Sequence, residues 1–457
     1  MRSNTPPENR MPVLEGVGSG RNTPSAARAH AAGGSASSYL QELVEAWHRE
    51  APRGIYSVCS AHPWVLEAAM EQAIADDAPL LIEATSNQVN HLGGYTGMAP
   101  ADFRRLVEKI AVQKGFNAER IILGGDHLGP NPWREQPVAE AMREAERMVV
   151  AYAQAGFTKI HLDASMACGD ERGPLSDEII ATRAATLCAA AERAGGSTKP
   201  VYVIGTEVPV PGGATESLSH LEPTQREAAA KTLAVHRRTF AERGLSAALP
   251  RVIALVVQPG VEFNHMDVVD YDPQHAAHLT RFLKEEHGLV YEAHSTDYQR
   301  PQAYRSLVRD GFAILKVGPA LTFAMREALE ALERIEAELA PPEKRSRLAA
   351  VMEHVMLEDP QHWKHHYSGD EQTIKLLRRY SYSDRVRYYW TKPQAVAAVD
   401  TLLRNLRETT IPETVLSAYL PDVYRAVRAG ELRSDPLEMV KHRIRSVLSG
   451  YAAACLP

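Results

Sequence analysis

Residues 120–165 read RIILGGDHLGPNPWREQPVAEAMREAERMVVAYAQAGFTKIHLDAS and contain the unit from which most of the chain is built. A short apolar run with a polar end, 120–127, leads into an amphipathic helical stretch and then into a second run of the same kind, 159–165. Short strands that alternate with longer helices are typical of βα units, whose strands pair in parallel. The stretch therefore predicts a parallel sheet covered by helices.

The same alternation continues on both sides of this unit. Eight apolar runs with polar ends occur in all, and helical stretches separate them. Eight such units are the number that closes a TIM (β/α)8 barrel, whereas an open doubly wound sheet is the alternative, because the pattern alone does not show closure. We predict an α/β protein with a TIM barrel whose strands lie at 55–62, 79–88, 120–127, 159–165, 201–208, 251–259, 289–297 and 313–320.

The two ends of the chain lack this alternation. The first 37 residues are rich in Ser, Pro, Gly, Asn and Arg and show no hydrophobic periodicity, as is typical of disorder. Beyond about residue 330 the patterns are helical only, and no strand candidate follows. We therefore expect a disordered arm at 1–37, a catalytic barrel at 38–330 and a C-terminal helical domain at 331–457, with a helix in 37–52 that closes the bottom of the barrel.

Composition argues against several classes of protein. The chain has 51 Lys and Arg residues against 57 Asp and Glu, a net charge of −6, so nucleic acid and membrane surfaces are not expected partners. The four cysteines form no C-x-x-C pair, which argues against a disulfide framework and a thiolate zinc site. Neither an apolar run of about 18 residues nor a signal-peptide pattern occurs. We expect a cytoplasmic protein.

Catalytic groups of a TIM barrel stand on the C-terminal ends of its strands, so the polar strand ends are the place to look for a site. Asp126 and His127 end the third strand, and both face one site only if the chain turns out of the strand there. Asp163 ends the fourth strand and Glu207 the fifth. A carboxylate in such a position is a metal ligand, a general base or a structural partner of an arginine.

Imidazoles also recur at these strand ends. His127, His265 and His294 follow three different strands, and Glu207 adds a carboxylate at the same predicted end of the barrel. Imidazole together with carboxylate suits Zn²⁺, Mn²⁺ or a similar divalent ion with an open coordination position. We therefore predict that these four residues bind a divalent metal ion.

The remaining polar strand ends are candidates for substrate binding. Lys316 precedes a glycine turn that opens a helix, where backbone N–H groups favour phosphate; a Schiff-base lysine is the alternative. The glycine-rich loop after the second strand matches neither G-x-G-x-x-G nor Walker A, so nucleotide binding is not indicated. The predicted substrate-binding residues are Ser60, Glu83, Asn87, Gln258, Asp297, Lys316 and Gly318.

A basic, tyrosine-rich segment stands out in the C-terminal part. It reads RRYSYSDRVRYYW and holds Arg378, Arg379, Arg385 and Arg387. These arginines could reach over the barrel to hold a phosphate, or could form an oligomer interface. The sequence leaves both interpretations open.

Several long strings together resemble one known family, the large subunits of bacterial tagatose-1,6-bisphosphate aldolases, which also includes the tagatose-6-phosphate 4-epimerases. The resemblance runs from about Ile55 to the C-terminus. The strings that carry it are SVCSAHP, IEATSNQVNHLGGYTGM, ILGGDHLGPNPW, KIHLDASM, IGTEVPVPGG, VVQPGVEF, YEAHSTDYQ and ILKVGPALTFA.

The resemblance implies a fold similar to the metal-dependent class II aldolases. By position, Asp126 then resembles their acid–base aspartate, and His127 and His294 resemble metal ligands. Lys316 to Gly318 is similar to the phosphate-holding eighth strand. The segment QPGVEFNH departs from the aldolase pattern, so the strand-six ligand stays open between three residues, Gln258, Glu262 and His265.

The resemblance implies two functions. One is a D-tagatose 6-phosphate 4-epimerase that forms fructose 6-phosphate, with a divalent metal ion and either retro-aldol cleavage or direct proton exchange at C4. Asp126 is then the first candidate for the base, and Glu207 and Asp163 follow. The other is a non-catalytic subunit that stabilises a separate class II aldolase chain. The expected partners are a ketohexose or its phosphate, such an aldolase chain and a second copy in a homo-oligomer.

Overall fold

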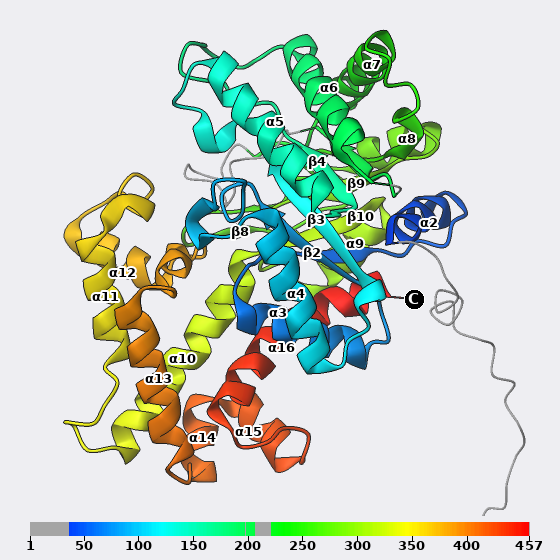
Figure 1. The fold of residues 1–457 in the computed structure, drawn as a ribbon. Helices are drawn as coiled ribbons and strands as arrows, with labels where there is room; N and C mark the ends of the chain where they lie inside the picture. The colour runs from blue at the N-terminus through cyan, green and yellow to red at the C-terminus, as the bar shows by residue number, and fades with distance from the viewer. Residues whose placement is uncertain (1–35, 197, 206–220, 457) are drawn as a thin grey trace, which may run out of the picture. The chain divides into compact units, whose positions relative to one another are not determined.

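The computed structural model describes residues 36–196, 198–205 and 221–456. Within these residues eight parallel strands close into a barrel, in the order β1-β10-β9-β6-β5-β4-β3-β2. The predicted TIM barrel is confirmed (Figure 1). The barrel strands are β1 (Ile55–Val58), β2 (Leu80–Thr85), β3 (Ile121–Leu128), β4 (Lys159–Leu162), β5 (Val201–Ile204), β6 (Val252–Val256), β9 (Val290–Ala293) and β10 (Phe312–Val317).

Each predicted strand overlaps an observed one, and most observed strands are shorter at the C-terminal end. At most of the described strands the apolar residues pair in the sheet and the polar residues that follow leave it as loops, whereas Asp126 and His127 lie within β3. One loop contains a hairpin that the sequence did not predict. Its two strands, β7 (Glu262–Phe263) and β8 (Val268–Val269), pair in antiparallel fashion after β6 and lie outside the barrel.

Helices surround the barrel and close its lower end. α2 (Ala36–His48) contacts β3, β6 and β10, and the indole Nε1 of Trp47 donates to the carbonyl of Arg309 at 3.1 Å. The predicted bottom helix is therefore present. The helices between successive barrel strands are α3 (Pro63–Ala75), α4 (Pro100–Lys114), α5 (Val138–Gln154), α6 (Asp177–Ala194), α7 (Arg226–Glu242), α8 (Ala277–Glu285) and α9 (Pro301–Arg309).

The C-terminal helices are continuous with the barrel. α10 (Pro319–Leu339) follows the last barrel strand and runs through residue 330, and α16 (Pro436–Cys455) packs on α3, α9 and α10 (Figure 1). The last helix thus completes the ring of helices around β1. The division into a barrel and a helical domain at residue 330 stays a prediction, and the arm expected at 1–37 lies almost entirely outside the described residues. The helices between α10 and α16 are α11 (Leu348–Glu358), α12 (Glu371–Tyr380), α13 (Pro393–Arg407), α14 (Glu413–Tyr419) and α15 (Pro421–Arg428).

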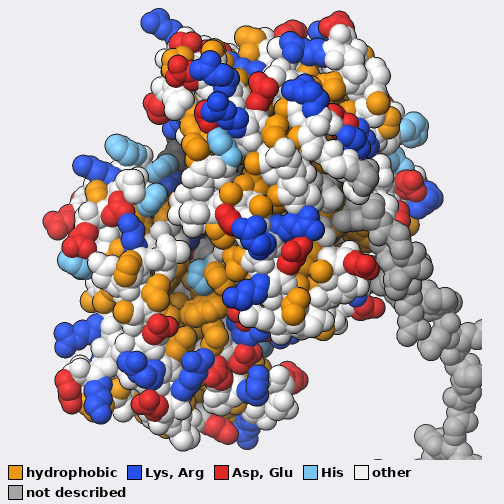
Figure 2. Space-filling view, viewed as in Figure 1, with side chains coloured by type: hydrophobic (Ala, Val, Ile, Leu, Met, Phe, Trp, Pro, Cys, Tyr) orange, Lys and Arg blue, Asp and Glu red, His pale blue; other side chains and the backbone are white. Residues whose placement is uncertain are grey.

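Positive and negative side chains are mixed on the face of the molecule that Figure 2 shows. Figure 2 shows lysine and arginine side chains interspersed with aspartate and glutamate over that face. Among the described helices none is both long and apolar enough to pass through a membrane.

Candidate active site

The end of β3 brings two neighbouring side chains into one cavity. Neighbours on a regular strand point to opposite faces, but His127 has a φ of 49°, in the left-handed region, and the register with β4 shifts at this point. Asp126 and His127 therefore both line the cavity at the barrel mouth. Gly124 permits the close approach of β2, because a Cβ there would lie 2.7 Å from the Cγ of Glu83.

Three histidines surround Asp126 at the mouth of the barrel. His127 and His161 come from β3 and β4, and His294 follows directly after β9; all three side chains are buried. One nitrogen from each histidine and one carboxylate oxygen of Asp126 lie within 4.8 Å of one another. These four groups converge on one point, with the donor types that Zn²⁺ and related ions prefer.

Two of the histidines are fixed by carboxylates behind them. The Nδ1 of His127 lies 2.6 Å from the Oδ2 of Asp163, and the Nε2 of His294 lies 2.9 Å from the Oε1 of Glu292. A carboxylate that accepts a hydrogen bond from one ring nitrogen keeps the proton on that outer nitrogen. The other, inner nitrogen faces the cluster and has a lone pair that can bind a metal ion. The inner nitrogens are the Nε2 of His127 and the Nδ1 of His294, so both rings suit metal binding.

His161 lies against Asp126, and both of its ring nitrogens already have partners. Its Nε2 lies 3.1 Å from the carbonyl oxygen of Gly205, and its Nδ1 lies 3.1 Å from the Oδ1 of Asp126. The backbone N–H of His127 also points to this Nδ1, at 3.3 Å. The ring therefore ties the ends of β3, β4 and β5 together at the cluster.

Burial and neighbouring charges set the protonation of the cluster. Burial lowers the pKa of His294 to about 3, which keeps it in the neutral form that binds metal. Burial alone would raise the pKa of Asp126, but His127 and Lys316 outweigh it and hold that pKa well below its usual value. For His127, burial lowers the pKa, whereas Asp126 and Asp163 raise it by more.

A layer of buried ion pairs lies directly below the cluster. The Nζ of Lys159 is 2.6 Å from the Oε1 of Glu83 and 2.6 Å from the Oε2 of Glu292, and all three side chains have zero exposure. Lys316 also pairs with Glu83, and its Nζ lies 2.8 Å from the Oδ1 of Asp126. The barrel interior is thus charged and nearly balanced.

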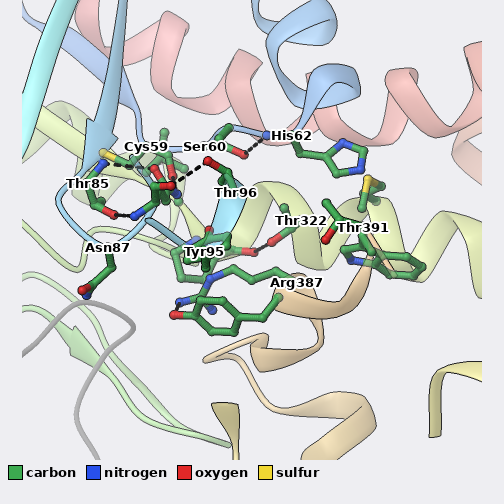
Figure 3. Close-up of a pocket in the computed structure, with 18 of the residues that line it drawn as sticks. Cys59, Ser60, His62, Thr85, Asn87, Tyr95, Thr96, Thr322, Arg387 and Thr391 are labelled. Atoms are coloured by element: carbon green, nitrogen blue, oxygen red, sulfur yellow. Dashed lines mark hydrogen bonds between the residues drawn. The ribbon is translucent and has the colours of Figure 1, made fainter. Parts of the chain in front are cut away.

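A cavity of about 570 Å³ opens above the cluster, and Figure 3 shows part of its wall. Five predicted substrate-binding residues line it: Ser60, Asn87, Asp297, Lys316 and Gly318. The cavity reaches from the barrel mouth to α13. Its size leaves room for a phosphorylated sugar with several polar contacts.

Two predicted substrate-binding residues do not line this cavity. Glu83 is fully buried between two lysines in the charged layer. Gln258 instead caps the loop after β6, where its Oε1 accepts from the backbone N–H groups of Gly260 and Val261 at 2.8 and 3.0 Å. Both side chains therefore stabilise the barrel mouth from within.

The structure does not bring His265 to the cluster. This residue sits in the turn between β7 and β8, which takes it out of the barrel toward the C-terminal helices. Its Nδ1 lies 3.1 Å from the Oγ of Ser381 and its Nε2 lies 2.8 Å from the carbonyl oxygen of His366. Both nitrogens are occupied, so the expectation that His265 binds the metal is not supported. Glu207 lies outside the described residues.

His161 was not among the predicted site residues. It lies two residues before Asp163, so the two side chains share one face of the strand, and this alternation is the signal that could have identified it. Lys159 has no sequence signal, because a lysine at the start of a strand looks exposed. Cys59 lines the cavity, and burial raises the pKa of its thiol, so it stays protonated.

Comparison with known proteins identifies the family. The family model described as D-tagatose-1,6-bisphosphate aldolase subunit GatZ/KbaZ-like matches residues 40–456. The chain belongs to the GatZ/KbaZ-like family. The resemblance that the motifs indicated is thereby confirmed.

Two solved structures are similar to this GatZ/KbaZ-like protein. A probable tagatose 6 phosphate kinase from Sinorhizobium meliloti is 52% identical with a TM-score of 0.82, over 88% of this chain and 100% of that chain. A fructose-bisphosphate aldolase from Campylobacter jejuni is 12% identical with a TM-score of 0.45, over 82% of this chain and 93% of that chain.

Proposed function

We propose that this GatZ/KbaZ-like protein is a metal-dependent epimerase that interconverts tagatose 6-phosphate and fructose 6-phosphate at C4. The observation that carries the proposal is the convergence of Asp126 and three histidines on the wall of a sugar-sized cavity. The family description and the name of the Sinorhizobium protein both point to tagatose phosphates as substrates. The free ketohexoses are a second candidate pair of substrates.

The donor set fits a divalent metal ion. His127 and His294 would hold it through their inner nitrogens, and His161 and Asp126 stand next to them. A bound Zn²⁺ or Mn²⁺ would act as a Lewis acid toward the C2 carbonyl of a ketohexose phosphate. Asp163 and Glu292 would fix the two imidazoles behind it.

Asp126 is the residue best placed to accept and return the proton of the C4 hydroxyl. C4 lies one carbon beyond the position that a C2 ketone acidifies, so enolisation alone does not invert it. In our proposal the Asp126 carboxylate accepts the C4 hydroxyl proton while the C3–C4 bond breaks, which gives glyceraldehyde 3-phosphate and the enediolate of dihydroxyacetone. The aldehyde rotates, the bond re-forms on its other face, and Asp126 returns the proton to the C4 oxygen.

Lys316 supports this role of Asp126. Its ammonium lies 2.8 Å from the Oδ1 of Asp126 and keeps the carboxylate ionised. The alternative is direct proton exchange at C4 between two opposed groups, which requires a second acid–base group across the cavity. Retro-aldol cleavage needs one such group, and we favour it because Asp126 is the one carboxylate of the described cluster, whereas Asp297 on the cavity wall accepts from two backbone N–H groups.

A non-catalytic subunit of a class II tagatose-1,6-bisphosphate aldolase is the second candidate. The description of the family as an aldolase subunit favours this function more directly than it favours the epimerase. The partner would then be a separate aldolase chain.

The test uses the purified full chain with tagatose 6-phosphate, with added Mn²⁺ or Zn²⁺ and with a chelator, and follows the products by NMR. We expect fructose 6-phosphate to form only with metal. Asp126→Asn and His127→Ala should abolish turnover, whereas the surface change Lys231→Met should not.

The outcome separates the two candidates. Retained activity in both Asp126→Asn and His127→Ala would show that the site is misassigned. No turnover by the chain alone, together with a gain in the activity of a class II aldolase when the chain is added, would establish the subunit.

A further inference from the structure

The phosphate site expected after β10 is already filled by the protein's own groups. The backbone N–H groups of Gly318 and Ala320, at the start of α10, donate to the Oδ1 of Asp297 at 3.0 and 2.9 Å. The ammonium of Lys316 faces Glu83 and Asp126. A phosphate at this place would displace one carboxylate and be repelled by the others, so the anion site lies elsewhere.

Arg387 is the arginine of the basic segment that faces the cavity. It lies in the short helix η7 (Arg385–Tyr389) and lines the cavity, whereas Arg378, Arg379 and Arg385 do not. Arg378 pairs with Glu353 and Arg379 with Glu330, but within the described residues Arg387 has no carboxylate oxygen within 4.0 Å. Asp384 and Asp297 act on Arg387 only at longer range, and a cation that faces a cavity without a direct ion pair is stabilised by an anionic ligand.

The guanidinium of Arg387 is held in place before any ligand binds. Its Nη1 donates to the backbone carbonyls of Ser383 and Asp384, and its Nη2 donates to the Oη of Tyr388 at 3.0 Å. The group also lies over the ring of Tyr388, 4.5 Å from the centroid. A fixed, planar guanidinium loses little entropy when it binds the oxygens of a phosphate.

Two tyrosines frame this end of the cavity. The rings of Tyr95 and Tyr388 meet edge to face with centroids 4.7 Å apart, and Figure 3 shows Tyr95 beside Arg387. Burial alone would raise the pKa of Tyr388, but the charges of Arg387 and Arg385 outweigh it and the net shift is downward. The two arginines thus favour negative charge at the hydroxyl of Tyr388.

The segment that carries Arg387 is anchored to the barrel. Asp384 directly precedes η7 with a φ of 44°, a left-handed conformation that strains a residue other than glycine. Its buried carboxylate accepts from the Oγ1 of Thr322 at 2.6 Å and lies 3.5 Å from the Nε of Arg326, both on α10. These contacts hold the strained turn and so fix the position of Arg387.

We propose that Arg387, with the hydroxyls of Tyr388 and Tyr95 beside it, binds the phosphate group of a phosphorylated sugar in this cavity. The inference rests on the proposed function for the identity of the substrate. The sugar carbons would then extend from this group toward Asp126, and the C-terminal segment would set the specificity for a phosphate monoester.

The test measures binding to the full chain by isothermal titration calorimetry, with fructose 6-phosphate, fructose and inorganic phosphate as probes. Arg387→Met should weaken fructose 6-phosphate and phosphate by about 10- to 100-fold, as expected for lost hydrogen bonds from a charged donor. Fructose binding should change little. Arg379→Met is the matched control, because this arginine pairs with Glu330 away from the cavity.

A second variant guards against loss of the fold in Arg387→Met. Tyr388→Phe removes the hydroxyl that Arg387 contacts and should weaken phosphate binding less, by a few fold. Equal affinity of the wild type and both variants for fructose 6-phosphate, or no measurable binding of phosphate sugars by the wild type, would overturn the inference. Phosphate binding that depends on Arg387 without any epimerisation would support it and refute the proposed function alone.

Discussion

Replacing Lys159 by methionine tests whether the charged layer of the barrel interior is balanced. Lys159, Glu83 and Glu292 have no exposure, and Lys159 lies 2.6 Å from an oxygen of each glutamate. Methionine nearly fills the volume of lysine, so the change removes the charge and leaves little cavity. The two glutamates would then share Lys316, which already faces Asp126.

The expected loss of stability follows from the burial of these charges. Removing one partner of a buried ion pair costs about 3–5 kcal/mol, because the remaining charge is uncompensated. With an unfolding entropy of about 2.1 cal/mol/K per residue over roughly 420 residues, this cost corresponds to a fall in Tm of about 3–6 °C. Scanning calorimetry of the wild type and the variant measures it.

Two further variants make the test decisive. Lys159→Met combined with Glu292→Gln restores the charge balance and should recover at least half of the lost Tm. Lys231→Met is the matched control, because Lys231 pairs with Asp177 on the surface, and we expect no resolvable change. If Lys159→Met unfolded at the wild-type temperature, or if the double variant were less stable than the single one, the reasoning from charge balance would be refuted.

Three further predictions concern the metal site and the docking of α16. Asp163→Asn should weaken Zn²⁺ binding about 10- to 100-fold in a competition titration, since Asp163 fixes the ring of His127, and unchanged affinity would remove that role. Lys441→Met should lower the stability to urea by about 2–4 kcal/mol, because the buried ammonium of Lys441 lies 2.7 Å from Glu71 on α3; an unchanged midpoint would contradict this. Burial alone would raise the pKa of Glu71, but Lys114 and Lys441 outweigh it and hold the pKa below its usual 4.5. The contribution of Glu71 to the free energy of unfolding is therefore complete above pH 4.5 and is lost as the pH falls through its folded-state pKa. Between pH 5 and 3 the Tm of Glu71→Gln should therefore fall less steeply than that of the wild type, and parallel curves would contradict this.

The barrel could be predicted from the sequence because each strand combines an apolar run with a polar end. The same pattern located Asp126, His127 and His294, since the C-terminal ends of parallel strands meet at one mouth. The condition that the chain must turn out of β3 is met by the positive φ of His127. The sequence indicates which side chains lie near the mouth of the barrel, and the backbone turn determines which of them face the cavity.

The errors have physical causes that a strand pattern does not contain. His265 was placed at the mouth because the segment after β6 was taken as a continuation of that strand, whereas the short β7–β8 hairpin carries it away. Glu83 was assigned to the substrate as one of the polar groups near a strand end, whereas it pairs with Lys316, which does line the cavity. Their pairing across the barrel depends on residues more than 200 positions apart, which no local pattern reveals.

Backbone strain at the barrel mouth is an independent argument that the mouth is a functional site of this chain. Seven described non-glycine residues have a positive φ; His127 and Ser295 line the cavity, and Asp384 precedes the segment that carries Arg387. Each such residue costs about 1–3 kcal/mol and persists only where its surroundings determine it. A subunit that merely stabilised another chain would gain nothing from this cost, nor from an arginine without a direct ion pair in the same cavity. Ser295→Gly would relieve this cost without removing the contacts that the side chains of His127 and Asp384 make, so a rise in Tm with a loss of ligand binding is the result expected of a site kept for function.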